Sequence, residues 1–246
     1  MILRQIFLGL ALVVALAPAV KAEPLIADLS ESVVKITTGF TGTKVLLFGA
    51  IEGSGKLVVV VEGPRHPVTV RRKQRIFGIW VNRAKVTFDD VPSFYQVLSS
   101  DPLEEWLPLR TRDLYQIGVE YLKFTPRDKV GPAEAARFRD ALIRNMQRIG
   151  RYGVLEGNVT VMGGQLFRAD LYLPANLPTG FYSIEVMLIN NGDVKSIQAT
   201  PLLVTKSGIG AQVYDLAYGN PALYGILCIV IAVLAGLGAN ALFRKA

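Results

Sequence analysis

The sequence predicts a mainly β protein with two β-sandwich-like (immunoglobulin-like) modules, a helical segment between them and one C-terminal transmembrane helix. Three observations predict this class. Short β-prone runs separated by turn residues fill two blocks of the chain, a helical apolar pattern lies between the blocks, and an uncharged apolar run lies near the C-terminus. Short strands at regular spacing are typical of a sandwich.

The first β block, 23–100, contains seven short runs at roughly ten-residue spacing. They are Val33–Thr37, Val45–Ile51, Lys56–Glu62, Pro67–Arg71, Ile76–Val81, Lys85–Phe88 and Phe94–Leu98. Gly53-Ser54-Gly55-Lys56 lacks the spacing of a phosphate-binding loop and is interpreted as a hairpin turn. The block is therefore expected to form a β-sandwich.

The segment 101–152 is expected to be helical. Asp101 is the predicted N-cap of a helix with Pro102 at its first position, and Leu109–Leu122 is also predicted to be helical. A further start at Gly131-Pro132-Ala133-Glu134 precedes apolar residues at helical spacing and predicts an amphipathic helix that ends near Gly150.

The second β block, 153–207, predicts the strands Val159–Met162, Gln165–Leu173, Gly180–Ile189 and Val194–Val204. Asn190-Asn191-Gly192-Asp193 is a strong hairpin signal because Asn and Gly tolerate positive φ. We infer a second β-rich module, to which the helix adds a layer. Whether the two blocks form one domain or two is left open by the sequence.

Both ends of the chain carry membrane signals. Residues 1–22 have one early charge, an apolar stretch and the ending Val20-Lys21-Ala22, which predicts a signal peptide cleaved before Glu23; an uncleaved anchor is the alternative. The run 221–242 has no charged residue and is long enough to span a bilayer as a helix. We expect 208–220 to be a juxtamembrane linker and 243–246, with Arg244 and Lys245, to be a cytoplasmic tail by the positive-inside rule.

The composition does not favour a nucleic-acid partner. The formal charge is +7, but four of the 27 basic residues lie in the signal peptide and tail, which leaves 23 basic against 20 acidic residues in the ectodomain. A body outside the cytoplasm is also in the wrong compartment for nucleic acid. The single cysteine, Cys228, lies in the span, so the ectodomain has neither a disulfide nor a thiolate metal site.

The sequence offers no pattern for common catalytic chemistry. The single histidine, His66, lies in a predicted turn and is more often solvated than catalytic, and one histidine excludes a multi-histidine metal site. Asp89-Asp90 and Glu104-Glu105 are adjacent acids whose side chains point in different directions, and both pairs fit turns and helix starts. We expect no enzymatic activity, no metal and no cofactor.

Two groups of residues are candidate contact sites. The basic cluster Arg71, Arg72, Lys73 and Arg75 fits an anion, a lipid headgroup or an acidic partner, although a charged strand edge that resists aggregation is the plainer interpretation. In the span, Cys228, Ala232, Gly236 and Asn240 recur every four residues and form a helix-packing face of small residues, a pattern that is also common in membrane helices without a partner. Trp80 and Trp106 are either core residues or a binding platform, and core is the plainer interpretation.

Several segments resemble a family of alphaproteobacterial transmembrane proteins without a known activity. They are Arg71-Arg72-Lys73, Gly78-Ile79-Trp80-Val81-Asn82, Val91-Pro92-Ser93-Phe94-Tyr95, 138–144, 166–169, 173–180 and the ending 224–244. The resemblance covers nearly the whole mature chain. It implies a signal peptide, a periplasmic β-rich ectodomain and one inner-membrane span, and it supplies no catalytic residues. It also implies a gene neighbourhood with sulfite-exporter-type permeases.

Together these observations predict a single-pass, periplasmic accessory protein of the bacterial inner membrane without catalytic activity, partnered with an anion permease of the sulfite-exporter type. The alternative is a periplasmic module that binds or senses a small oxyanion or a lipid headgroup, suggested by the basic cluster and the two tryptophans.

Overall fold

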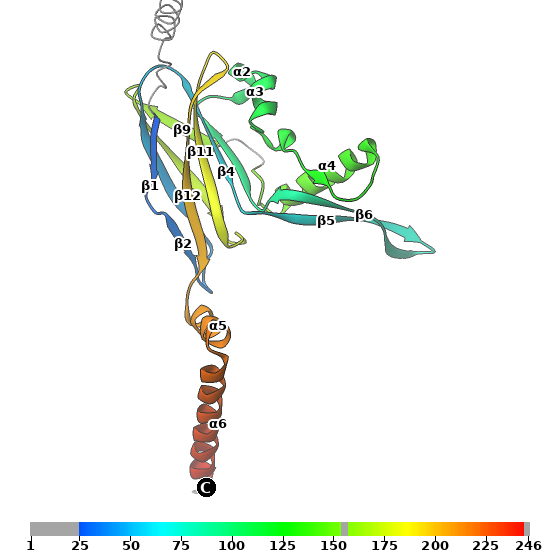
Figure 1. The fold of residues 1–246 in the computed structure, drawn as a ribbon, viewed down its shortest axis with the longest axis vertical. Coiled ribbons are helices and arrows are strands. Elements are labelled where there is room, and N and C mark those ends of the chain that lie inside the picture. Colours follow the sequence, from blue (N-terminus) through cyan, green and yellow to red (C-terminus); the bar gives the residue numbers. More distant parts are fainter. Residues whose placement is uncertain (1–24, 154–156, 244–246) are drawn as a thin grey trace, which may run out of the picture.

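The computed structural model describes residues 25–153 and 157–243. The predicted signal peptide, 1–22, and the two basic residues of the predicted cytoplasmic tail lie outside the described residues. Within them, the mainly β class with a helical insert and an apolar C-terminal helix is confirmed. Figure 1 shows the arrangement: a curled sheet forms the body, a long hairpin projects to one side, and the C-terminal helices leave from one end.

The body is built on a nine-stranded sheet with the order β1-β3-β10-β9-β7-β4-β11-β12-β2 (Figure 1). Its strands are β1 (Leu25–Leu29), β2 (Val33–Ile36), β3 (Gly42–Ile51), β4 (Lys56–Glu62), β7 (Tyr95–Ser99), β9 (Gly157–Met162), β10 (Leu166–Pro174), β11 (Gly180–Asn190) and β12 (Asp193–Lys206). The β7–β9 and β2–β12 pairs are parallel and the other neighbours are antiparallel.

The sheet curls until β1 meets β12. Gln198 on β12 closes the seam, because its side-chain amide donates to the carbonyl of Ala27 at 2.9 Å and its Oε1 accepts from the Ala27 amide at 2.9 Å. A core cluster fills the inside of the curl, and a second cluster covers the outer face of β4, β7 and β11. Strands β4, β7 and β11 are therefore covered on both faces of the sheet.

Strand β4 explains why the two predicted β modules share one sheet. Its five central residues are all buried, with Leu57, Val59 and Val61 in the inner core and Val58 and Val60 in the outer core. A strand that is apolar on both faces must be paired on both edges and covered on both sides. It pairs with β7 from the first block and β11 from the second. The two blocks thus interleave in one sheet.

The interpretation of 53–56 as a hairpin turn is wrong. Strand β3, which precedes this segment, pairs with β1 and β10, whereas β4, which follows it, pairs with β7 and β11. The glycines turn the chain sharply, but the turn carries it across to the other half of the sheet. Turn residues fix a local change of direction and leave the choice of strand partner to the core.

The hairpin predicted at 190–193 is confirmed. Strands β11 and β12 pair from Gly180 to Asn190, and the two turn residues, Asn191 and Gly192, have φ angles of 52° and 83°. The predicted alternation along β11 is also found, since Tyr182, Ile184, Val186 and Leu188 all lie in the inner core.

The helical insert covers the outer core. It contains α2 (Leu103–Trp106), α3 (Leu109–Leu114), the 3₁₀ turn η1 (Val119–Tyr121) and α4 (Pro132–Arg148), and α4 begins and ends as predicted. Asp101 is not an N-cap: Pro102 occupies that position without a side-chain cap, and Asp101 instead lies 3.5 Å from Lys56. The single helix expected over 109–122 is interrupted at Gln116 and Gly118, both of which have positive φ.

Two helices follow the body at its C-terminal end. The segment 208–220, predicted as a juxtamembrane linker, contains α5 (Ile209–Gly219), and α6 (Pro221–Phe243) follows it. Within α6, Pro221–Ala239 is long and apolar enough to cross a membrane, and none of that stretch is buried against the protein. A second, three-stranded sheet, β5 (Arg65–Ile76), β6 (Ile79–Pro92) and β8 (Thr125–Pro126), leaves the body between β4 and β7.

Candidate interaction site: the β5–β6 arm

The β5–β6 hairpin is an arm that is packed at its base and exposed along its outer half. The strands pair antiparallel from Arg65 opposite Pro92 to Ile76 opposite Ile79. Near the base, Val70, Val86 and Phe88 are buried in the outer core, and α4 lies against β5. Past Arg72 and Ala84, which still contact the outer core, the arm extends clear of the body (Figure 1). We call residues 71–85 the outer arm.

The base of the arm is fixed to the body by polar contacts. Arg65 forms a two-pronged ion pair with Glu62, with a closest N–O distance of 2.7 Å, and also donates to the carbonyl of Asp90 at 3.1 Å. The hydroxyl of Tyr152 donates to the carbonyl of Pro92 at 2.8 Å. Burial raises the pKa of Tyr152, so this hydroxyl keeps its proton. The arm therefore leaves the body in a set direction.

Acidic residues near the base of the arm also make structural contacts. Asp89 pairs with Arg127 of the segment beside β6, and this contact raises the pKa of Arg127. Burial is the main cause that raises the pKa of Glu185 on β11, and nearby Glu62 adds to it. Among the described residues no group of three metal-ligating side chains is found.

The tip of the arm is a tight turn in which a phenylalanine takes a left-handed conformation. Phe77 and Gly78 have φ angles of 47° and 84° and connect Ile76 to Ile79. The prediction of one strand over 76–81 is therefore wrong. Two-residue turns usually contain Asn or Asp before Gly, and a bulky residue at positive φ is uncommon. The sequence pattern around Phe77 therefore did not predict a turn.

The side chains around this turn form an exposed apolar tip. It consists of Ile76, Phe77, Ile79, Trp80 and Val81, of which Phe77 is 100% exposed, Ile79 69% and Trp80 65%. Trp80 is thus not a core residue, whereas Trp106 packs against the outer core. Exposed apolar groups clustered at one point mark an interaction site more often than scattered ones do. In the sequence, the feature that could have indicated this tip is a single glycine, Gly78, flanked by large apolar residues.

Behind the tip lies a basic collar of six residues: Arg71, Arg72, Lys73, Arg75, Arg83 and Lys85. The chain has no acidic residue between His66 and Phe88. Within the described part of the chain, no ion pair involves any of the six cations. Arg71 lies directly opposite Lys85, a like-charge pair that destabilises a hairpin unless an external anion compensates it.

The collar points to both sides of the arm. The strand register places Arg71, Lys73, Arg75 and Lys85 on one face. Arg72 is on the other face, with its guanidinium 5.9 Å from the ring centre of Phe138 on α4. Arg83 is the extra residue of a β-bulge opposite Arg72 and Lys73.

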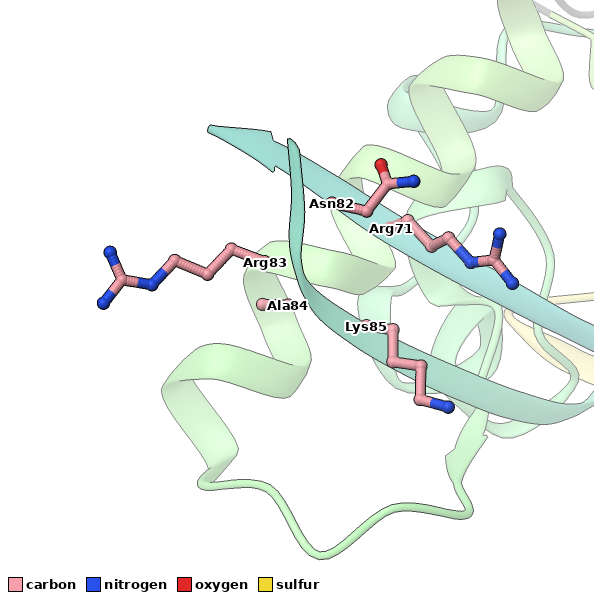
Figure 2. Close-up of a pocket in the computed structure, with 5 residues that line it drawn as sticks. All are labelled: Arg71, Asn82, Arg83, Ala84 and Lys85. Atoms are coloured by element: carbon pink, nitrogen blue, oxygen red, sulfur yellow. The ribbon is translucent and has the colours of Figure 1, made fainter. Parts of the chain in front are cut away.

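A shallow, open hollow of about 380 Å³ is lined by Arg71, Asn82, Arg83, Ala84 and Lys85. Figure 2 shows that the side chain of Arg83 extends away from those of Arg71 and Lys85. The hollow is therefore an exposed cationic surface, and its charged groups do not converge on one point.

Three of the four candidate residues of the span lie on a stretch of α6 that is not buried against the protein. Cys228, Ala232 and Gly236 are exposed on α6, and the space next to Gly236 is open. Asn240 follows four residues later on the same helix. Tyr214 and Tyr218 on α5 are exposed and have ring centres 4.4 Å apart, close to where α6 begins.

Residues 24–245 match the family described as "Putative transmembrane protein (Alph_Pro_TM)". No curated protein matches the sequence. One similar solved chain comes from "Structural basis of T cell specificity and activation by the bacterial superantigen toxic shock syndrome toxin-1". It has 8% identity and a TM-score of 0.26, and the match covers 75% of this chain and 100% of that chain. A similarity this weak carries no functional argument. The family match extends over the body, the arm and α6 together, and the chain therefore belongs to this family of transmembrane proteins.

Proposed function

We propose that this protein is a non-catalytic accessory protein of the bacterial inner membrane, with its body in the periplasm, its tail in the cytoplasm and an anion permease of the sulfite-exporter type as its partner. The observation that carries the proposal is the arm: its outer half adds little to the core and displays an apolar tip and six cations, none of which has an ion pair among the described residues. A feature that costs stability and faces outward is expected of an interaction protein.

The C-terminal helix supports a partner inside the membrane. Small side chains at Cys228, Ala232 and Gly236 let a neighbouring helix approach closely, and Asn240 offers a polar group for the same contact. The proposed orientation is supported by Arg244 and Lys245 after the span, which favour a cytoplasmic C-terminus. The body would then stand outside, where the arm reaches the surface around the partner.

The proposal is tested by purifying the full-length chain from native membranes in mild detergent and identifying co-purified proteins by mass spectrometry. We expect a permease with the wild type and at least a tenfold loss with Gly236→Leu, because a leucine blocks close helix approach. Gly238→Leu is the matched control, since it makes the same change about 200° around the helix. Recovery of no membrane protein, or equal recovery with both variants, would contradict the proposal.

A second candidate function, binding of a small oxyanion, is favoured by the like-charge pair of Arg71 and Lys85, which lie directly opposite each other and line the hollow of Figure 2. Sulfite, sulfate, phosphate and organosulfonates would then raise the melting temperature at constant ionic strength, since a ligand at 100 times its Kd stabilises by about 2.7 kcal/mol. The rise should vanish in Arg71→Gln/Lys85→Gln. An unchanged melting temperature with every anion would exclude this function.

A further inference from the structure

We propose that the apolar tip of the arm inserts into the surface of an acidic-lipid bilayer, with the basic collar among the lipid phosphates. This inference rests on the proposed function, in which the arm is the contact element, and it names what the arm contacts. It follows from five features of the outer arm: the chemistry of the tip, the order of the rows behind it, the strain at Phe77, the charge, and the position of the arm on an anchored body.

The tip has the composition of a group that enters a membrane interface. Phe77 and Trp80 are aromatic, Ile76, Ile79 and Val81 are aliphatic, and all are exposed. Aromatic rings, and tryptophan above all, are enriched at the headgroup level of membranes. The tip is also convex, because a two-residue turn ends it. A fluid bilayer accommodates a convex apolar group directly, whereas a protein partner must supply a matching pocket.

The rows of the hairpin are in the order that a bilayer requires. Ile76 faces Ile79 at the tip, Arg75 faces Trp80 in the next row of the same ladder, and Arg71 faces Lys85 near the base of the outer arm. Each residue along a strand advances by about 3.3 Å, so four residues from Arg75 to Arg71 cover roughly 13 Å. The polar region on each side of a bilayer is about 5–8 Å thick. Insertion of the tip therefore places the collar at and just outside the phosphates.

The left-handed conformation of Phe77 lowers the stability of the turn. A two-residue turn with both φ angles positive is satisfied best by Asn-Gly, because asparagine tolerates the left-handed region. This chain has Phe at φ 47° instead, fully exposed and with no core contact. Strain at an exposed position is retained where the side chain has an external use.

The charge of the outer arm selects acidic lipid. A basic residue near an anionic membrane surface is worth about 1 kcal/mol, which corresponds to roughly a fivefold change in affinity per cation. The cations also point to both sides of the arm, with Arg83 directed away from Arg71 and Lys85 (Figure 2). Immersion among headgroups pairs both sides at once, whereas an acidic protein surface meets one side.

The C-terminal anchor keeps the arm near a bilayer. In Figure 1 the arm runs across the direction of α6, so the tip reaches the bilayer that α6 crosses when the body tilts. We place the joint at Gly208, which has φ 123° and open space where a Cβ would lie. A tethered contact forms at high effective concentration, so even a weak insertion is populated.

The test uses the fluorescence of Trp80 in the full-length chain, in a Trp106→Phe background, reconstituted in nanodiscs. The discs contain phosphatidylcholine with or without phosphatidylglycerol, and the acyl chains are brominated. We expect a blue shift and strong quenching in the acidic discs, weaker quenching in the neutral discs, and relief by salt. Arg71→Gln/Lys85→Gln should lower the inserted-to-free ratio roughly 25-fold, at fivefold per cation.

Phe77→Asn is the second variant. It should fold at least as well as the wild type, because Asn-Gly suits the turn, yet show clearly less quenching of Trp80. Solvent-like emission without quenching in acidic discs would overturn the inference, as would equal quenching in neutral discs. Photo-crosslinking from position 72 in native membranes separates the two proposals. A captured protein together with an unquenched Trp80 would contradict the lipid contact but remain consistent with the accessory function.

Discussion

Raising the pH from about 10 to about 12 is expected to remove much of the stability of the folded body. Tyr95, Tyr152 and Tyr182 are almost fully buried, and burial is the main cause that raises their pKa values from 10, to about 12 for Tyr182 and further for the other two. In the unfolded chain these hydroxyls lose their protons near pH 10, while the folded protein keeps them. The folded state then binds more protons, so the free energy of unfolding falls as the pH rises.

The expected slope is large. Each buried tyrosine contributes at most about 1.4 kcal/mol per pH unit, so the three together lower the free energy of unfolding by up to about 4 kcal/mol per unit, against a typical total of about 5–15 kcal/mol. Two of these hydroxyls connect separate segments of the chain. Tyr95 donates to the carbonyl of Gln116 at 2.6 Å and accepts from the amide of Gly118 at 2.9 Å, and Tyr152 donates to the carbonyl of Pro92 at the end of β6.

Urea unfolding followed by circular dichroism across this pH range measures the slope. Tyr152→Phe should lower stability at neutral pH by about 1–3 kcal/mol, since it removes the buried hydroxyl that donates to the carbonyl of Pro92, and should reduce the alkaline slope by about a third. Tyr172→Phe, which removes an exposed hydroxyl, is the matched control. Stability that stayed flat to pH 12 would show that these hydroxyls are not held protonated in the core.

Gly49→Ala is expected to destabilise the body by about 3 kcal/mol or more. A Cβ at Gly49 would overlap the carbonyl oxygen of Ile26 and would lie 2.6 Å from Cζ of the Phe167 ring. The first of these atoms is backbone, so the clash is relieved only if β1 moves away from β3. Since β1 closes the curled sheet through Gln198, its displacement would also open the inner core.

Thermal and urea unfolding of the detergent-solubilised full chain test this expectation. Gly39→Ala is the control, because Gly39 has no atom near its would-be Cβ and no positive φ, and the change should be neutral or slightly stabilising. A loss below about 0.5 kcal/mol in Gly49→Ala would mean that β1 does not pack on β3 as closely as the structure shows.

Part of the candidate site was visible in the sequence. The run Arg71–Arg75 is a concentrated charge in any conformation, and it was identified for that reason. The apolar tip was missed because Phe77-Gly78 has the composition of a strand rather than a turn, so 76–81 was interpreted as one continuous strand. Only their position at the end of a hairpin, with nothing packed over them, shows that they face outward.

The sequence by itself determined the elements whose cause is local: the turn at Asn191-Gly192 through positive φ, α4 through its proline start and apolar stripe, and α6 through its length and lack of charge. Tertiary structure decided which strands pair. The buried run of β4 needed partners and cover on both sides, and it found them in β7, β11 and two cores contributed by distant parts of the chain. Burial on two faces is satisfied by long-range packing, so the single interleaved sheet, and with it the direction of the arm, is a property of the whole fold.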